Sequence, residues 1–520
     1  MTNDIVRVES GLLAGARSAD GTVCSFKGVP YAEPPVGPLR WKPPQPPQPW
    51  NGIRPATAFG PRSIQPNRPT HAVGYFGPEP ESEDCLTLNI WTAARAPDEK
   101  RPVMVWFHGG AFLVGSGSLP IFHGDTLARR GVVLVTVNYR LGRLGFLAHP
   151  ELSAEQSYRG SGNYGHLDQL EALRWIKANI AAFGGDPGCV TIFGQSAGSS
   201  TVNTLMASPL AKGIFQRAIG QSGGSFFTHA LPQINVAEKS GLKFARALGA
   251  RSIDELRAKP ACEIQFARPP DNKLIEFYDS NDAGGIDRAT AWPIIDGHLL
   301  KERVFETFAR GAQNDVPLLT GATADEGSTQ PPIPTLAEHK RRAVAEYGDM
   351  AAAFLKAFPA NSDTEAQQTG RRIIGTRVFN WENWTWASMQ AETGRSGVYF
   401  YHFNRAPPKP IIGDRGDLSR DIGVFHTAEI PYVFQTLDAR SWPWRDEDRA
   451  LSDRMAAYWT NFAASGNPNG PELPAWPRFD PQQPTTLHFS DGIQAGAVPD
   501  IATLQFWTAF DQQIRRDAAA

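Results

Sequence analysis

One short stretch, residues 183–198, constrains the fold of this chain more than any other. It reads FGGDPGCVTIFGQSAG. Residues 190–193 form an apolar, β-branched run typical of a buried strand, and residues 199–206 have helical spacing. Between them lies a Gly-x-Ser-x-Gly pentapeptide centred on Ser196. Strand, pentapeptide and helix together predict a nucleophile elbow, in which the serine stands on a sharp turn above a helix N-terminus.

A second pentapeptide of the same form occurs at residues 220–224, which read GQSGG. It also follows a strand-like run, but the residues after it, SFFTHALP, offer no convincing helix. The required strand-turn-helix context therefore favours Ser196 over Ser222 as the nucleophile.

The pattern of apolar residues predicts an α/β fold. Residues 103–107 and 132–137 are apolar throughout, which indicates strands covered on both faces, and residues 167–180 place apolar side chains on one helix face. This alternation predicts a doubly wound, mostly parallel sheet. Further strands are expected at 316–320, 398–403 and 486–489, the last as the terminal strand, and helices at 237–258, 335–357, 363–396 and 447–464.

A serine hydroxyl needs a base to take its proton, and the base needs a third group to orient it. In this fold class the acid follows the serine and the histidine follows the acid. Of the eleven histidines, His426 lies in a polar, glycine-containing loop after a strand, where it can reach the carboxyl edge of the sheet. Asp325 and Glu326 follow the strand expected at 316–320, and both are candidate acids.

These motifs resemble those of the type-B carboxylesterases, the α/β-hydrolase branch that includes cholinesterases and bacterial p-nitrobenzyl esterases. The resemblance runs through most of the chain, in EDCLTLNI (83–90), HGGAF (108–112), NYRLG (138–142), GNYG (162–165), DEG (325–327), HTAE (426–429) and WTNFA (459–463). It implies an α/β-hydrolase fold with the triad Ser196, Glu326 and His426, and it leaves Asp325 as the alternative acid. The oxyanion hole that it implies consists of the N–H groups of Gly110, Ala111 and Ala197.

By the same resemblance we expect residues 1–520 to form a single catalytic domain, with a mainly helical insertion around 323–396 over the site. Aromatic side chains from this region line the substrate gorge in the family. We expect some of the following to form an apolar wall that suits bulky or aryl esters, although core packing is the commoner role for any single one: Phe226, Phe227, Phe379, Trp381, Trp384 and Trp386.

The resemblance implies hydrolysis of small-molecule carboxylic esters through an acyl-enzyme. An amidase, lactonase, carbamate or toxin esterase could use the same triad. A non-enzymatic adhesion or scaffold protein is disfavoured, because serine, acid and histidine are all present. Since no His-Glu-x-x-His or Cys-x-x-Cys motif occurs, we expect neither a metal nor another cofactor.

Charge and hydropathy argue against two classes of partner. The net charge is −2, and no basic block stands out, so neither nucleic acid nor an anionic membrane surface is an expected partner. The first residues lack the features of a secretory signal, and no uncharged apolar stretch approaches the roughly 20 residues that span a bilayer. We expect a cytoplasmic protein, with secretion left open if a signal peptide was removed.

Cysteine usage supports a reducing compartment. In secreted relatives the cysteine of the EDCL motif is bridged to one in an upstream Gly-Pro-x-Cys-like stretch. Here that stretch reads GPRS, and Ser63 stands at the partner position. We therefore expect Cys85 to be a buried free thiol.

Cys85 should titrate as a free thiol in the denatured, unreduced protein, and reducing agent should leave the thermal stability unchanged. Mass spectrometry of an unreduced digest measures this directly. A disulfide from Cys85 to Cys24, Cys189 or Cys262 would contradict both this prediction and the cytoplasmic one.

Overall fold

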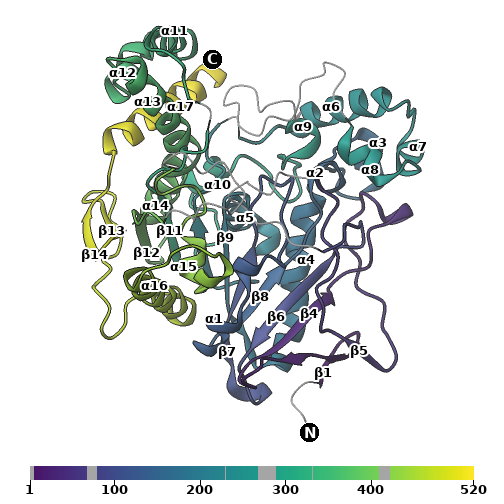
Figure 1. Cartoon of the computed structure of the whole chain (residues 1–520). Helices are drawn as coiled ribbons and strands as arrows, with labels where there is room; N and C mark the ends of the chain where they lie inside the picture. The colour runs from purple at the N-terminus through teal and green to yellow at the C-terminus, as the bar shows by residue number, and fades with distance from the viewer. Residues whose placement is uncertain are drawn as a thin grey trace.

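A large mixed sheet crosses the molecule (Figure 1). The computed structural model describes residues 5–66, 79–228, 230–267, 288–330, 332–408 and 422–519. Within them, an 11-stranded sheet has the order β14-β13-β12-β11-β10-β9-β7-β8-β6-β4-β3. Its strands are β3 (Ala16–Arg17), β4 (Cys24–Pro30), β6 (Thr87–Thr92), β7 (Arg101–Phe107), β8 (Val133–Val137), β9 (Gly185–Gln195), β10 (Arg217–Gln221), β11 (Leu318–Thr323), β12 (Val398–Phe403), β13 (Thr485–Phe489) and β14 (Ile493–Ala497). A small second sheet contains β1 (Ile5–Val8), β2 (Gly11–Ala14) and β5 (Ile53–Pro55).

The strands from β8 to β13 in this order run parallel, and the antiparallel strands lie at the two edges. The doubly wound, mostly parallel sheet expected from the sequence is thus confirmed. Helices cover both faces. They are α1 (Asp125–Arg129), α2 (Gly142–Phe146), α3 (Pro150–Glu155), α4 (Tyr164–Asn179), α5 (Ala197–Ala207), α6 (Ile234–Ala247), α7 (Ile253–Arg257), α8 (Ala261–Phe266), α9 (Arg288–Ala291), α10 (Val304–Ala309), α15 (Ile430–Phe434) and α16 (Asp446–Ser465).

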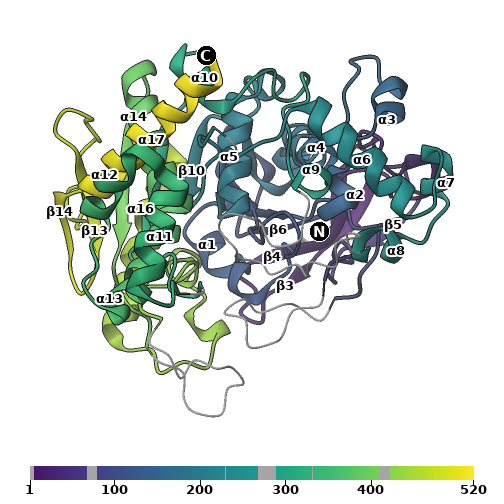
Figure 2. The same ribbon diagram turned by 90° about the horizontal axis from the view of Figure 1, so that it is seen from above.

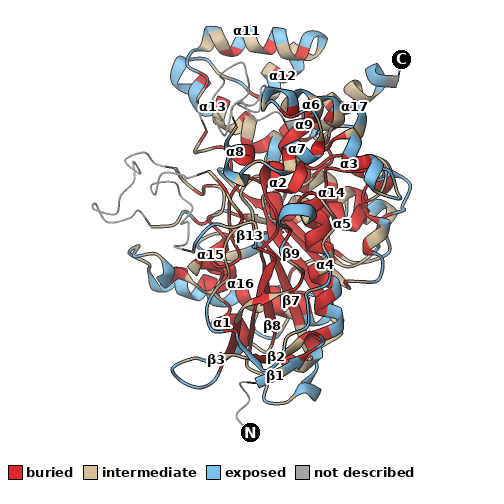
Figure 3. Cartoon of the chain, turned by 90° about the vertical axis from the view of Figure 1, so that its right-hand side faces the viewer, coloured by how far each residue is buried: buried red, intermediate tan, exposed pale blue. Residues whose placement is uncertain are grey.

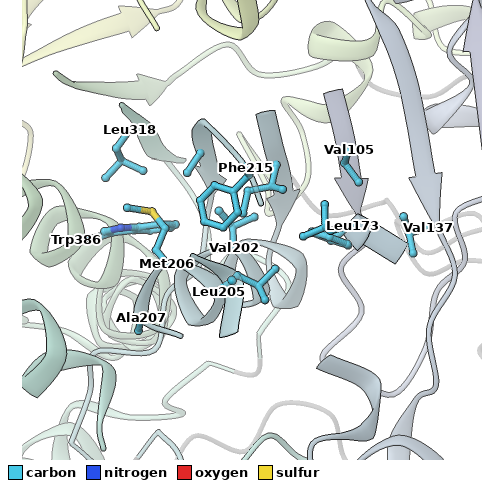
Figure 4. Close-up of a cluster of buried hydrophobic side chains, with 14 of the residues drawn as sticks. Val105, Val137, Leu173, Val202, Leu205, Met206, Ala207, Phe215, Leu318 and Trp386 are labelled. Atoms are coloured by element: carbon cyan, nitrogen blue, oxygen red, sulfur yellow. The ribbon is translucent and has the colours of Figure 1, made fainter. Parts of the chain in front are cut away.

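Alternate residues of the central strands enter two different cores. Val103, Val105 and Phe107 of β7 pack in one cluster with α4 and α5, whereas Met104 and Trp106 pack in another with α16. Figure 3 shows the sheet almost wholly buried between its covering helices. Figure 4 shows part of the first cluster, including Val105, Val202 of α5 and Trp386. Burial on both faces explains why these strands are apolar throughout.

The strand order also fixes where a site can form. β8 lies on one side of β7, and β9 lies on the other. The connections that leave β7 and β9 therefore diverge, and a crevice opens between the carboxyl ends of these two strands. The loop after β7 and the turn after β9 meet there.

Helices between β11 and β12 occupy the region where the sequence predicts a helical insertion. They are α11 (Leu336–Tyr347), α12 (Ala351–Ala357), α13 (Asp363–Gly375), a π-helical turn (Thr376–Asn380) and α14 (Trp381–Thr393). In Figures 1 and 2, the yellow helix α17 (Ile501–Ala519) lies against this group.

The helix α17 ties the insertion to the rest of the molecule. Trp507 is fully buried, and its Nε1 donates to Thr376 Oγ1 at 3.1 Å. Asp511 Oδ1 accepts hydrogen bonds from the N–H and hydroxyl of Thr228, at 2.9 and 2.8 Å. The sequence prediction missed α17 and β14, so its assignment of 486–489 as the terminal strand is wrong, although this strand itself is confirmed as β13.

The cysteines fit the sequence prediction. All four are free, and Cys85 is fully buried. Burial raises the pKa of the Cys85 thiol to about 12, against the opposing effect of a side-chain hydrogen bond with Ser63. A hydroxyl thus stands beside Cys85 where the secreted relatives place a sulfur.

Among the described residues, no helix combines the length and apolar character needed to cross a bilayer.

A buried ion pair joins the loop after β8 to helix α4. Arg140 binds Asp168 through Nε at 2.8 Å and Nη2 at 2.6 Å, and both side chains are almost fully buried. The Asp168 carboxylate also accepts the Arg140 N–H at 3.1 Å. Removing one partner would leave the other charge buried without compensation.

Asp168→Asn should therefore lower the free energy of unfolding by about 3 to 5 kcal/mol. The measurement is the midpoint of guanidinium unfolding. The double variant Arg140→Met/Asp168→Leu, which removes both charges, should lose less than the single variant. An equal or larger loss in the double variant would contradict the uncompensated-charge explanation.

Candidate active site

Ser196 occupies a strained turn between β9 and α5. Its φ of 58° and ψ of −123° are unusual for a residue with a side chain. A Cβ at Gly198 would overlap the carbonyl oxygen of Phe107, and a Cβ at Gly194 would overlap the Gly198 backbone. Both glycines are therefore required for the reversal. Strand, turn and helix are all present as the sequence predicts, and Ser196 remains partly exposed.

Ser222 occupies a related turn, but its side chain is buried. Its φ is also positive, at 54°. Its side chain is fully buried, however, and in the described part of the chain its Oγ has no hydrogen-bond partner. The next helix, α6, begins only at Ile234. A substrate could not reach Ser222 in this conformation.

Glu326 and His426 meet behind the elbow. Glu326 is fully buried, and its Oε1 accepts the Thr323 N–H at 2.8 Å. Its Oε2 hydrogen-bonds Nδ1 of His426, whose side chain is 14% exposed. The Phe379 ring from the π-helical turn stacks on the imidazole, with centroids 4.2 Å apart and planes at 29°. Among the described residues, no hydrogen bond joins Ser196 Oγ to His426, and such bonds often form only when a substrate is bound.

Asp325, the alternative acid, binds the backbone of the histidine loop. Its N–H donates to the Val424 carbonyl at 3.0 Å, and its Oδ2 accepts the Val424 N–H at 2.8 Å. Gly423 has a φ of 55°, and a Cβ there would overlap the Asp325 carboxylate. Asp325 thus fixes the path of the loop that carries His426, while Glu326 contacts the imidazole.

The loop after β7 lies directly against the elbow. Gly110, Ala111 and Phe112 all have positive φ, at 112°, 55° and 57°. A Cβ at Gly109 would lie 3.0 Å from the Ser196 Cβ. Within the described chain, the N–H groups of Gly110, Ala111 and Ala197 bond no protein acceptor. Free donors beside a serine are what a developing oxyanion requires.

His108 supports this loop as a neutral side chain. Burial lowers its pKa to about 4, although a hydrogen bond to the Gly109 carbonyl opposes the shift. Its Nδ1 lies 2.8 Å from that carbonyl. Tyr139 stacks on the imidazole at 4.5 Å and donates its hydroxyl to the His108 carbonyl at 2.8 Å. These contacts of His108 and Tyr139 hold the loop after β7 in place.

A second set of polar side chains surrounds the loop that carries His426, and the sequence does not predict their contacts. Gln195 Nε2 lies 3.1 Å from His426 Nε2 and 3.3 Å from Nδ1. Gln221 Nε2 donates to Glu429 Oε1 at 3.0 Å. Burial, and then the nearby Glu326, raise the pKa of Glu429 to about 7. Gln195 and Gln221 each occupy the second position of their pentapeptide, directly before the serine. This repetition is the sequence signal that could have pointed to them.

The six aromatic residues expected at the substrate wall occupy different environments. Phe379 contacts His426. The other five pack in or against the main core: Phe226, Phe227, Trp381, Trp384 and Trp386.

A different aromatic pair lies at the loop after β7. Trp292 meets Phe112 edge to face at 5.3 Å, in a cluster that also includes Ala197. Phe112 belongs to the HGGAF stretch, whereas no pattern around Trp292 indicates its place.

Comparison with known proteins identifies the family of this chain. A family model described as the Carboxylesterase family matches residues 2–507. The fumonisin B1 esterase of Sphingopyxis macrogoltabida is 38% identical over 486 residues, which cover 91% of this chain and 84% of that enzyme. The para-nitrobenzyl esterase of Bacillus subtilis (strain 168) is 34% identical over 500 residues, 94% of this chain and 95% of that enzyme.

Solved structures are similar over nearly the whole chain. That of a thermophilic PNB esterase aligns with a TM-score of 0.81 and 32% identity, covering 97% of this chain and 100% of the other. This chain therefore belongs to the carboxylesterase family and is a carboxylic ester hydrolase with the α/β-hydrolase fold.

Proposed function

We propose that the enzyme hydrolyses esters with apolar or aryl groups through an acyl-enzyme on Ser196. The observation that carries the proposal is that a partly exposed serine on a strained turn follows Gln195, whose side chain contacts the His426 of the Glu326–His426 pair. The residues come from loops after three different strands, β9, β11 and β12.

The proposed reaction begins when Ser196 Oγ attacks the ester carbonyl carbon and His426 Nε2 takes the hydroxyl proton. Glu326 stabilises the imidazolium through Nδ1. The carbonyl electron pair moves to the oxygen, which accepts hydrogen bonds from Gly110, Ala111 and Ala197. As the carbonyl re-forms, the bond to the alcohol oxygen breaks and His426 protonates the leaving alcohol. Water then repeats these steps and releases the carboxylic acid.

Apolar or aryl substrates fit the surfaces beside these groups. Phe112 of the loop after β7 is buried, but Trp292 packed against it and Phe379 over His426 are both partly exposed. A toxin ester is a second candidate substrate, because the relative at 38% identity is named as a fumonisin B1 esterase.

The four free thiols favour a reducing compartment such as the cytoplasm.

Ser196→Ala should lower kcat for a p-nitrophenyl ester by roughly 10⁵-fold, because loss of one triad member removes most of the triad's effect. Ser222→Ala should change kcat by less than about tenfold, since this serine is buried away from substrate. A fluorophosphonate probe should label the wild type and Ser222→Ala but not Ser196→Ala. The reverse labelling pattern would refute the assignment of the nucleophile.

Glu326→Gln should lower kcat by roughly 10³- to 10⁴-fold, since the amide cannot stabilise the imidazolium. Asp325→Asn is the matched control, because its amide oxygen can still accept the Val424 N–H. We expect it to change kcat by less than about tenfold. A larger loss of kcat in Asp325→Asn than in Glu326→Gln would show that Asp325, and not Glu326, is the acid of the triad.

A further inference from the structure

The side chain of Gln195 lies over the face of the His426 imidazole. Its Nε2 is 3.1 Å from one ring nitrogen and 3.3 Å from the other. An atom in the ring plane at such similar distances would collide with a ring carbon. The amide nitrogen therefore lies above the plane, and its contact with the ring is of the N–H···π kind. The in-plane electron pair of His426 Nε2 stays free for the Ser196 proton.

The imidazole is consequently enclosed on three sides. Phe379 is stacked at 4.2 Å, and a stacked ring cannot share a face with the Gln195 amide, so the two side chains cover opposite faces. Glu326 binds the Nδ1 edge. Gln195 is itself fixed, because it is 1% exposed and its Cα pairs with that of Gln221 at the ends of β9 and β10.

The titratable groups around this ring are carboxyl groups. Glu326 faces it from the loop after β11, and Glu429 lies in the same turn, where its Oε1 is bonded to Gln221. Asp325 binds the loop backbone at Val424. Carboxylates favour the protonated imidazole, which is useless as a base. Gln195 instead covers the ring without adding a further carboxylate.

We propose that Gln195 is a positioning residue for the base: its uncharged amide covers one face of the His426 ring and leaves Nε2 free for Ser196 without adding a further carboxylate that would stabilise the imidazolium. This inference rests on the proposed triad. It gives a reason for an amide at a position where a carboxylate of the same size would touch the same ring.

The test is the pH dependence of kcat/KM for a p-nitrophenyl ester, whose acid limb reports the pKa of the base in the free enzyme. Gln195→Glu places a carboxylate against the imidazole and stabilises its protonated form. We expect the acid limb to move to higher pH by roughly 1 to 3 units. Gln195→Met, with similar length and no charge, should move it by less than about half a unit. Equal acid limbs in the two variants would overturn the proposal.

Further measurements distinguish a loss of folded enzyme from a change at His426. Labelling with a fluorophosphonate counts the folded active sites in each variant, so that rates are compared per competent enzyme. If Gln195→Glu does not fold, Gln195→Asp carries the charge on a shorter side chain and should move the acid limb in the same direction; no movement would also overturn the proposal. Turnover retained in His426→Ala would refute the triad itself. An inactive His426→Ala with an unmoved acid limb in the glutamate variant refutes only the role of Gln195.

Discussion

The close approach of two backbones, at the end of β7 and the start of α5, is the constraint on which the rest of the site depends. A Cβ at Gly198 would overlap the Phe107 carbonyl oxygen, and a Cβ at Gly194 would overlap the backbone of Gly198. A Cβ at Gly109 would lie 3.0 Å from the Cβ of Ser196. With glycine at all three positions, the loop after β7 and the elbow after β9 come into van der Waals contact. The strand order brings these two loops to the crevice of the sheet, and the glycines then set their separation.

The two Gly-Gln-Ser-x-Gly pentapeptides express the same geometry on neighbouring strands. The Ser196 N–H donates to the Gln221 carbonyl at 2.9 Å, and the Ser222 N–H donates to the Gly321 carbonyl at 2.8 Å. Each turn thus extends the ladder of the sheet by one bond towards the next strand. What separates the two serines is the helix that follows only the first. That helix leaves Ser196 at an accessible terminus, whereas Ser222 is covered by the surrounding core.

Local patterns were sufficient to predict the central strands, the elbow and the loops that carry the candidate triad. Each of these depends on a few neighbouring residues, such as the apolar run before Ser196. The aromatic wall was harder to predict, because helical spacing does not say which side of α14 is covered. Trp386 points into the core shared with α5, a direction set by tertiary packing. The contact between Gln195 and His426 joins residues 231 positions apart, which no local pattern encodes.

The attachment of α17 has a consequence for the order in which the molecule can be completed. Trp507 bonds the π-helical turn that carries Phe379, and Asp511 holds the loop at Thr228. Both anchors lie more than a hundred residues beyond the segments that they secure. During synthesis, Ser196 and helix α5 leave the ribosome long before helix α17, which holds the turn that carries Phe379. The nascent chain therefore carries the elbow at Ser196 for most of translation without this attachment, and the candidate site is complete only after residues 501–519 have emerged.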